Sequence, residues 1–170
     1  MTIEDFKATV DIYITQLQPY DHAELYLKPN KSSWSIGQLY MHLLEETYWY
    51  FEQIQLCLGN SDHARETMSE KAKEIFRNNG FPNEIIKGDP FISDQIAQPS
   101  DKKHLIEKFE KLKSDAYVIW DSIESATQFG KRKHPGLEFF GPKEWFQYAE
   151  MHMRHHLRQK QRIDLFLAHR

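Results

Sequence analysis

Three histidines occur within five positions near the carboxyl end of the chain, at His152, His155 and His156. They lie in the stretch EWFQYAEMHMRHHLRQKQRI, residues 144–163, which is expected to form a helix. Because a helix turns by about 100° per residue, His152 and His156 are only about 40° apart around its axis. Two imidazoles on one helix face can bind a single metal ion. The alternative is a pair of core histidines, either hydrogen-bonded or beside a solvent-lined cavity.

The apolar residues of this stretch indicate which histidines face inward. Relative to His152, five of them fall between about −40° and +60° around the helix: Trp145, Ala149, Ile163, Phe166 and Leu167. His152 and His156 lie inside this stripe, whereas His155, at about −60°, lies at its edge. We therefore expect His152 and His156 to point into the protein together. His155 is expected to orient another group or to handle protons on the substrate side.

A fourth histidine, His42, lies in another strongly helical stretch, residues 35–58. It falls on the apolar face, and Glu46, at about +40° from it, also faces inward, whereas Glu45, at about −60°, is expected in solvent. A carboxylate in a helix core is rarely free. Glu46 is interpreted as a partner that orients a histidine or as a catalytic base on metal-bound water. The alternative is a carboxylate that reaches solvent at the mouth of a cavity.

Composition restricts the class of protein and its partners. The chain has 170 residues, of which 40% are hydrophobic, so one folded domain over residues 1–170 is expected. Its net charge of −3 is made of mixed signs without a basic stripe, so nucleic acid is not an expected partner. The single cysteine, Cys57, excludes an intramolecular disulfide and is expected in the core. The absence of an apolar signal core and of a run near ~18 apolar residues predicts a cytoplasmic protein without a membrane span.

The first two helical stretches have recognisable start signals. Thr2 can cap the first, and Pro19 stops it. The second opens with Ser35 and Gln38, which form a Ser-x-x-Gln capping box, and ends before a Gly-Asn pair. Four further histidines fall in loops or at helix ends and are expected at the surface: His63, His104, His134 and His169.

Two more helices are expected in the second half of the chain. Ser100 and Asp101 offer an N-cap, and Pro142 suits the first turn of the last helix. Between them, one apolar stripe recurs at spacings of three and four: Leu105, Phe109, Leu112, Ala116, Ile119 and Ile123. Residues 130–141 are expected to form an irregular link, and no strand is expected anywhere in the chain.

The connection over residues 60–100 is long for a link between neighbouring antiparallel helices. A short helix is expected over SEKAKEIF, and turn signals interrupt the rest: Asn78-Asn79-Gly80, Pro82, Gly88-Asp89-Pro90 and Pro99. This length allows a crossover, so the second and third long helices can run parallel. The sequence therefore predicts an all-α, four-helix bundle with a long crossover between helices two and three.

Two motifs resemble the DinB-like (DinB/YfiT) superfamily. WSIGQLYMHL, residues 34–43, is similar to its helix-two signature. His134-Pro135, Glu144-Trp145 and HMRHHLRQ, residues 152–159, are similar to its carboxyl-terminal signature. Residues 136–140 depart from the Gly-rich Pro-x-x-Gly turn that follows the His-Pro pair in many relatives. The resemblance covers essentially the whole chain and implies an up-down-down-up bundle. It also implies a divalent metal ion held by His42, His152 and His156.

Such a site implies a particular chemistry. Three neutral imidazoles suit Zn²⁺ or Ni²⁺, and three protein ligands leave a position open for water or substrate. The resemblance implies an S-transferase that uses a low-molecular-weight thiol, such as bacillithiol or mycothiol, and an electrophile, with Glu46 or His155 handling protons. The alternatives are a metal-dependent hydrolase and a non-catalytic, stress-related module with a structural metal. Phe51 and Phe146 lie outside the inferred stripes, where they either cover a homodimer face or are singly exposed.

Overall fold

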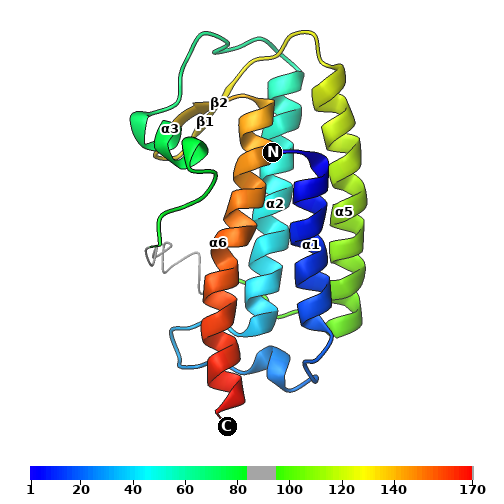
Figure 1. Ribbon diagram of the computed structural model, residues 1–170. Coiled ribbons are helices and arrows are strands. Elements are labelled where there is room, and N and C mark those ends of the chain that lie inside the picture. Colours follow the sequence, from blue (N-terminus) through cyan, green and yellow to red (C-terminus); the bar gives the residue numbers. More distant parts are fainter. Residues whose placement is uncertain (84–94, 170) are drawn as a thin grey trace.

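The computed structural model describes residues 1–83 and 95–169 and is mostly helical, which confirms the all-α prediction. Long helices lie side by side in it (Figure 1): α1 (Ile3–Leu17), α2 (Ile36–Leu58), α5 (Lys102–Ser125) and α6 (Pro142–Ala168). In this view α1 and α6 run downward, whereas α2 and α5 run upward. α2 contacts both α5 and α6, and α1 contacts the same two helices from the other side. The interface between α2 and α6 is the one that concerns function.

The expected helix starts are confirmed. The Thr2 hydroxyl accepts a hydrogen bond from the Asp5 amide at 3.3 Å and caps α1. Ser35 and Gln38 form the reciprocal capping box of α2. Asp101, and not Ser100, caps α5, and α6 begins at Pro142. These local signals set where each long helix begins, and therefore which side chains share a level along the helices.

The links contain shorter elements. η1 (Glu24–Tyr26) follows α1, and α3 (Glu70–Arg77) confirms the short helix expected in the long connection. The Gly88-Asp89-Pro90 turn signal lies outside the described residues. β1 (Arg132–His134) and β2 (Glu138–Phe140) form an antiparallel hairpin, so the expectation that no strand occurs is wrong. Each strand has three residues, which is too short to produce a recognisable alternation.

More side chains are buried in the core than one apolar stripe per helix predicts. All six stripe residues of α5 are buried, as expected. Phe51 and Phe146 are buried as well, and their rings stack with centroids 6.0 Å apart. Both expectations for these two rings, exposure on a homodimer face and exposure as single residues, are therefore wrong. The reason is that α2 and α6 each contact several neighbours, so each buries side chains over a wide arc.

Two tyrosines connect the helices that carry the candidate ligands. The Tyr40 hydroxyl on α2 donates to the Tyr13 carbonyl on α1 at 2.9 Å. The Tyr13 hydroxyl in turn donates to the Met153 carbonyl on α6 at 2.8 Å. All these contacts are buried, where an unmade hydrogen bond is unfavourable. This tyrosine chain holds α2 and α6 in register at the level of the histidines.

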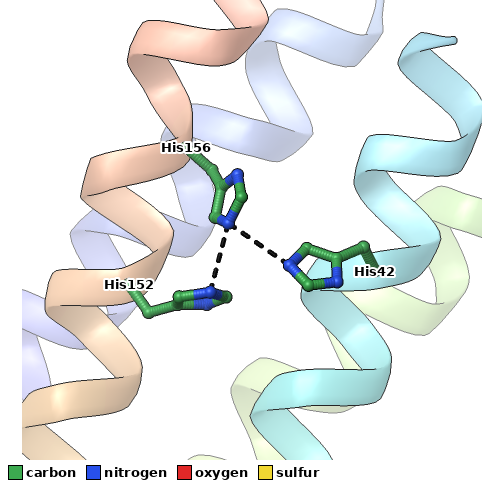
Figure 2. Close-up of side chains that lie close together, drawn as sticks. All are labelled: His42, His152 and His156. Atoms are coloured by element: carbon green, nitrogen blue, oxygen red, sulfur yellow. Dashed lines mark hydrogen bonds between the residues drawn. The ribbon is translucent and has the colours of Figure 1, made fainter. Parts of the chain in front are cut away.

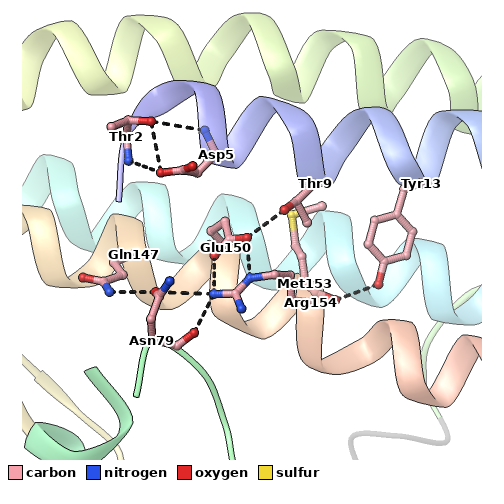
Figure 3. A network of polar contacts seen from close by, with 9 residues as sticks. All are labelled: Thr2, Asp5, Thr9, Tyr13, Asn79, Gln147, Glu150, Met153 and Arg154. Atoms are coloured by element: carbon pink, nitrogen blue, oxygen red, sulfur yellow. Dashed lines mark hydrogen bonds and ion pairs between the residues drawn. The ribbon is translucent and has the colours of Figure 1, made fainter. Parts of the chain in front are cut away.

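A charged network holds α6 against α1 and against the segment after α3 (Figure 3). Glu150, only 3% exposed, accepts hydrogen bonds from the Thr9 hydroxyl at 2.7 Å and from Arg154 Nε at 2.6 Å. Arg154 also donates to the Asn79 carbonyl at 2.8 Å. A buried carboxylate needs such a partner to be tolerated. Because Glu150 and Arg154 flank His152, the network fixes α6 at the turn that carries this histidine.

Within the described residues, no helix combines the length and the apolar character needed to cross a membrane.

Candidate metal centre

The structure brings His42 on α2 together with His152 and His156 on α6 (Figure 2). The His156 Nε2 atom lies 3.2 Å from His42 Nε2 and 3.1 Å from His152 Nε2. One ligand atom from each ring lies within 4.8 Å of the other two. Within the described residues, no cysteine or carboxylate joins this group. The three histidines selected by helical geometry can therefore hold a metal ion.

Two of the three separations between ring nitrogens match those of imidazoles that share one ion. Metal–nitrogen bonds of about 2.0–2.1 Å place two ligand atoms about 3.3 Å apart in tetrahedral geometry and about 2.9 Å apart at right angles. The two short separations around His156, 3.1 and 3.2 Å, fall between these values. The two pairs that include His156 therefore already have the spacing of ligands to one ion, and the third pair lies within 4.8 Å.

Hydrogen bonds among the rings cannot replace an ion. His156 Nδ1 lies 2.8 Å from the Gln159 side-chain oxygen, which only accepts, so His156 Nε2 presents its single lone pair to the other rings. One lone pair cannot accept linear hydrogen bonds from both neighbours. A cation would be bound by the Nε2 lone pairs of all three rings, so this donor set fits a divalent metal ion.

Burial keeps these rings in the neutral form that binds metal. It lowers the pKa of His42 to about 4 and is the largest cause that lowers the pKa of His156 to about 3. Burial also holds the pKa of His152 well below its usual value, and the neighbouring histidines act in the same direction. Metal binding requires unprotonated imidazole. At pH 7, none of the three ligand rings has to lose a proton.

Aromatic rings surround the centre. The Trp34 ring lies 4.7 Å from the His42 ring and 6.3 Å from the His156 ring, measured between centroids. The Tyr50 ring meets the His152 ring edge-on at 5.6 Å. Helical geometry did not identify Trp34, because this residue precedes the Ser35 cap and lies outside α2. The sequence signal that could have identified Trp34 is its position in the same motif as His42, residues 34–43.

Glu46 lies one turn after His42 but does not join the three histidines. It is partly buried, and burial raises its pKa, while a hydrogen bond with Tyr50 opposes this shift. Because the Tyr50 ring contacts His152, Glu46 is linked to the centre through Tyr50. Glu45 is exposed, as expected. Helical angle correctly placed Glu46 inward but did not define its neighbours.

His155 does not belong to the group of three histidines, although its ring meets the His156 ring edge-on with centroids 5.3 Å apart. Its Nδ1 atom lies 2.9 Å from Arg158 Nη2, so this nitrogen accepts a hydrogen bond. The Phe81 ring covers it with centroids 5.4 Å apart. Burial lowers the pKa of His155, and the positive charges of Arg158 and Arg162 lower it further. The structure thus places His155 beside the segment after α3, at the margin of the site.

The expectation for His134 is wrong, whereas His63, His104 and His169 are exposed as expected. The hairpin folds back on α6 and places the His134 ring between Phe140, Trp145 and Tyr148, with centroids 5.1, 5.4 and 4.7 Å away. Its Nδ1 atom is buried without a hydrogen-bond partner among the described residues. Burial lowers the pKa of His134 to about 4.

This burial predicts acid sensitivity. An unfolded histidine titrates near pH 6.5, about 2.5 units above His134 in the folded protein. Between these values only the unfolded chain takes up the proton, so stability is present above pH 6.5 and is lost as the pH falls toward 4, by up to about 1.4 kcal/mol per pH unit. We expect His134→Phe to remove this contribution in urea unfolding of the metal-free protein at pH 7.5 and 5. The exposed His104→Phe serves as control, and equal pH slopes for wild type and His134→Phe would contradict the expectation.

A buried lysine was not identified from the sequence. Lys160, one turn beyond His156, is 3% exposed, and its ammonium donates to the Tyr20 hydroxyl at 2.6 Å and to Asp164 at 2.9 Å. The Tyr20 hydroxyl also donates to Asp164, which closes a three-membered polar cluster. Leu157, Lys160 and Asp164 line a hollow of about 640 Å³ beside this cluster. The cluster joins the end of α1 to α6, and its polar groups satisfy one another.

Comparison of the chain with models of protein families finds no match, and neither does comparison with curated proteins. The fold and the site therefore define a class: a mostly helical protein with three converging histidines that can hold a metal ion.

Proposed function

We propose that the protein is a metal-dependent S-transferase. In this proposal His42, His152 and His156 hold a divalent ion, Zn²⁺ or Ni²⁺, at which a low-molecular-weight thiol reacts with a small electrophile. The observation that carries it is the convergence of three neutral imidazoles, with no fourth protein ligand in the group among residues 1–83 and 95–169. A structural zinc site usually has four protein ligands, whereas a catalytic site keeps one position open. The partial exposure of His42 and His152 supports access to that position.

We further infer that the chain is a single four-helix bundle of the DinB-like superfamily, with up-down-down-up helices. The opposite directions of α1 and α2, and the shared direction of α2 and α5 across the long connection, support this topology (Figure 1). The motifs that carry the resemblance supply the His42, His152 and His156 ligands together with Trp34 and Gln159 around them. The two motifs that resemble the DinB-like superfamily therefore contain the residues of the proposed metal centre.

When bound, the ion would supply Lewis-acid stabilisation of the thiolate. The chain contributes the remaining functions. Glu46, which is linked to His152 through Tyr50 and whose pKa is raised by burial, would accept the proton released from the thiol, with His155 as the alternative acceptor. The Trp34 ring would exclude water from one side of the site. The sulfur lone pair then forms the new bond to the electrophilic carbon, and the leaving group departs with its bonding electrons.

The test compares metal-loaded and metal-free protein with a panel of low-molecular-weight thiols and a chromogenic aryl halide. A free thiol with pKa near 8.5 is only about 3% thiolate at pH 7, so complete ionisation alone predicts an acceleration of roughly 30-fold. We expect the metal-loaded protein to reach at least this factor and Glu46→Gln to reduce it. Equal rates with and without metal would rule out the transferase. Metal-dependent ester hydrolysis would identify the hydrolase alternative, and thermal stabilisation by metal without either activity would identify a structural metal.

A further inference from the structure

We infer that Gln159 is a positioning residue that sets the tautomer of His156 and prepares this ring to bind the ion. The inference rests on the proposed metal centre and adds a residue to it. Gln159 lies three positions after His156 on α6, so the two side chains share a helix face. Its side-chain oxygen lies 2.8 Å from His156 Nδ1.

The position of the proton on a neutral imidazole decides which of its two nitrogens can bind a metal ion. Such a ring carries one proton, on either Nδ1 or Nε2, and the hydrogen bond made by one nitrogen decides the state of the other. The amide oxygen of Gln159 accepts, so the proton of His156 resides on Nδ1. Its Nε2 atom then keeps a lone pair, directed at the space between His42 and His152. Without this contact, either tautomer is open to His156, and only one of them can ligate.

The neighbouring ligand on the same helix provides a comparison. His152 Nδ1 is buried but has no hydrogen-bond partner among the described residues. No contact of that nitrogen therefore selects the tautomer of His152. The protein supports its two α6 ligands unequally, and His156 is the ring held ready. Hydrogen bonds that orient a metal-bound histidine typically change metal affinity by about 10–100-fold.

Three variants separate this role from a general effect on folding. Gln159→Leu removes the acceptor, whereas Gln159→Glu keeps an acceptor and cannot donate. Gln161→Leu makes the same chemical change at an exposed position on the same helix, about 180° from His152 around the axis. With Zn²⁺ competed against a chromophoric chelator, we expect Gln159→Leu to weaken binding about 10–100-fold. Gln159→Glu should bind at least as tightly as wild type, and Gln161→Leu should match wild type.

A second readout uses the metal-free protein. Nitrogen-15 shifts of His156 should show a protonated Nδ1 in wild type and in Gln159→Glu, and a mixture of tautomers in Gln159→Leu. Circular dichroism confirms that each variant is folded. Protonation of His156 at Nε2 in wild type, or unchanged zinc affinity in Gln159→Leu, would overturn the inference. If wild-type protein bound no zinc, the metal centre itself would fail, while the tautomer measurement would still decide the role of Gln159.

Discussion

Replacement of His42 by alanine should leave the purified protein with little bound metal. His42 is the ligand that α2 contributes, and its loss leaves only the two α6 histidines. Because an entire ligand is removed, we expect affinity to fall by more than about 100-fold, beyond the typical effect of losing a supporting hydrogen bond. Metal analysis after purification measures this directly. His104→Ala, which removes an exposed histidine of α5, should retain the wild-type metal content.

The same variant should lose its thermal response to metal. An ion at 100 times its dissociation constant stabilises a folded protein by about 2.7 kcal/mol, and this corresponds to roughly 5–10 °C in Tm for a chain of this size. We expect that shift in wild type and in His104→Ala but not in His42→Ala at the same zinc concentration. Full metal occupancy together with a preserved Tm shift in His42→Ala would show that the ion binds elsewhere.

Replacement of Arg154 by leucine should be the most destabilising single change in the polar network of Figure 3. It removes the positive partner of Glu150, whose side chain is 3% exposed, whereas that of Arg154 is 37% exposed. Loss of one member of a buried pair typically costs about 3–5 kcal/mol, because the other charge stays buried without compensation. The Thr9 hydrogen bond remains, so we expect about 3 kcal/mol and a Tm lower by roughly 10 °C.

A second substitution separates the charge effect from lost packing. The double variant Glu150→Gln/Arg154→Leu contains no buried charge at this position and should recover a large part of the stability lost in Arg154→Leu. Arg65→Leu, an identical change at an exposed turn residue, should shift stability by less than about 0.5 kcal/mol. Urea unfolding measures all three. A double variant no more stable than Arg154→Leu alone would assign the loss to packing of the arginine side chain.

The ligand histidines were predictable because helical geometry determines which residues share a face. His152 and His156 are one turn apart on α6, and His42 lies on the apolar face of α2, so each orientation follows from local sequence. Their meeting at one level depends on packing between the two helices. Periodicity alone does not contain that information, and for these residues the family resemblance supplied it.

The residues whose position or neighbours the sequence did not predict share a different physical cause. His134 becomes half-buried because a hairpin of three-residue strands folds against α6, and so short a motif has no distinctive periodicity. Glu46 has the predicted inward direction, but its hydrogen-bond partner is determined by the position of the Tyr50 side chain. Phe51 and Phe146 are buried because their helices each touch several neighbours. For each of these residues, contacts between secondary-structure elements determined its burial or its neighbours. The angle of a residue around its own helix axis does not contain that information.

The tyrosine chain from Tyr40 through Tyr13 to Met153 has a consequence for the order of events during maturation. Its hydrogen bonds join α2, α1 and α6 without using an imidazole nitrogen. Bringing the three histidines together costs conformational entropy. Helix packing would supply the free energy for this step, without an ion. Zinc-finger domains behave in the opposite way, since their chains fold only as the metal binds. In this protein, by contrast, the packed helices would bring the three histidines together without an ion, so folding would not depend on metal loading.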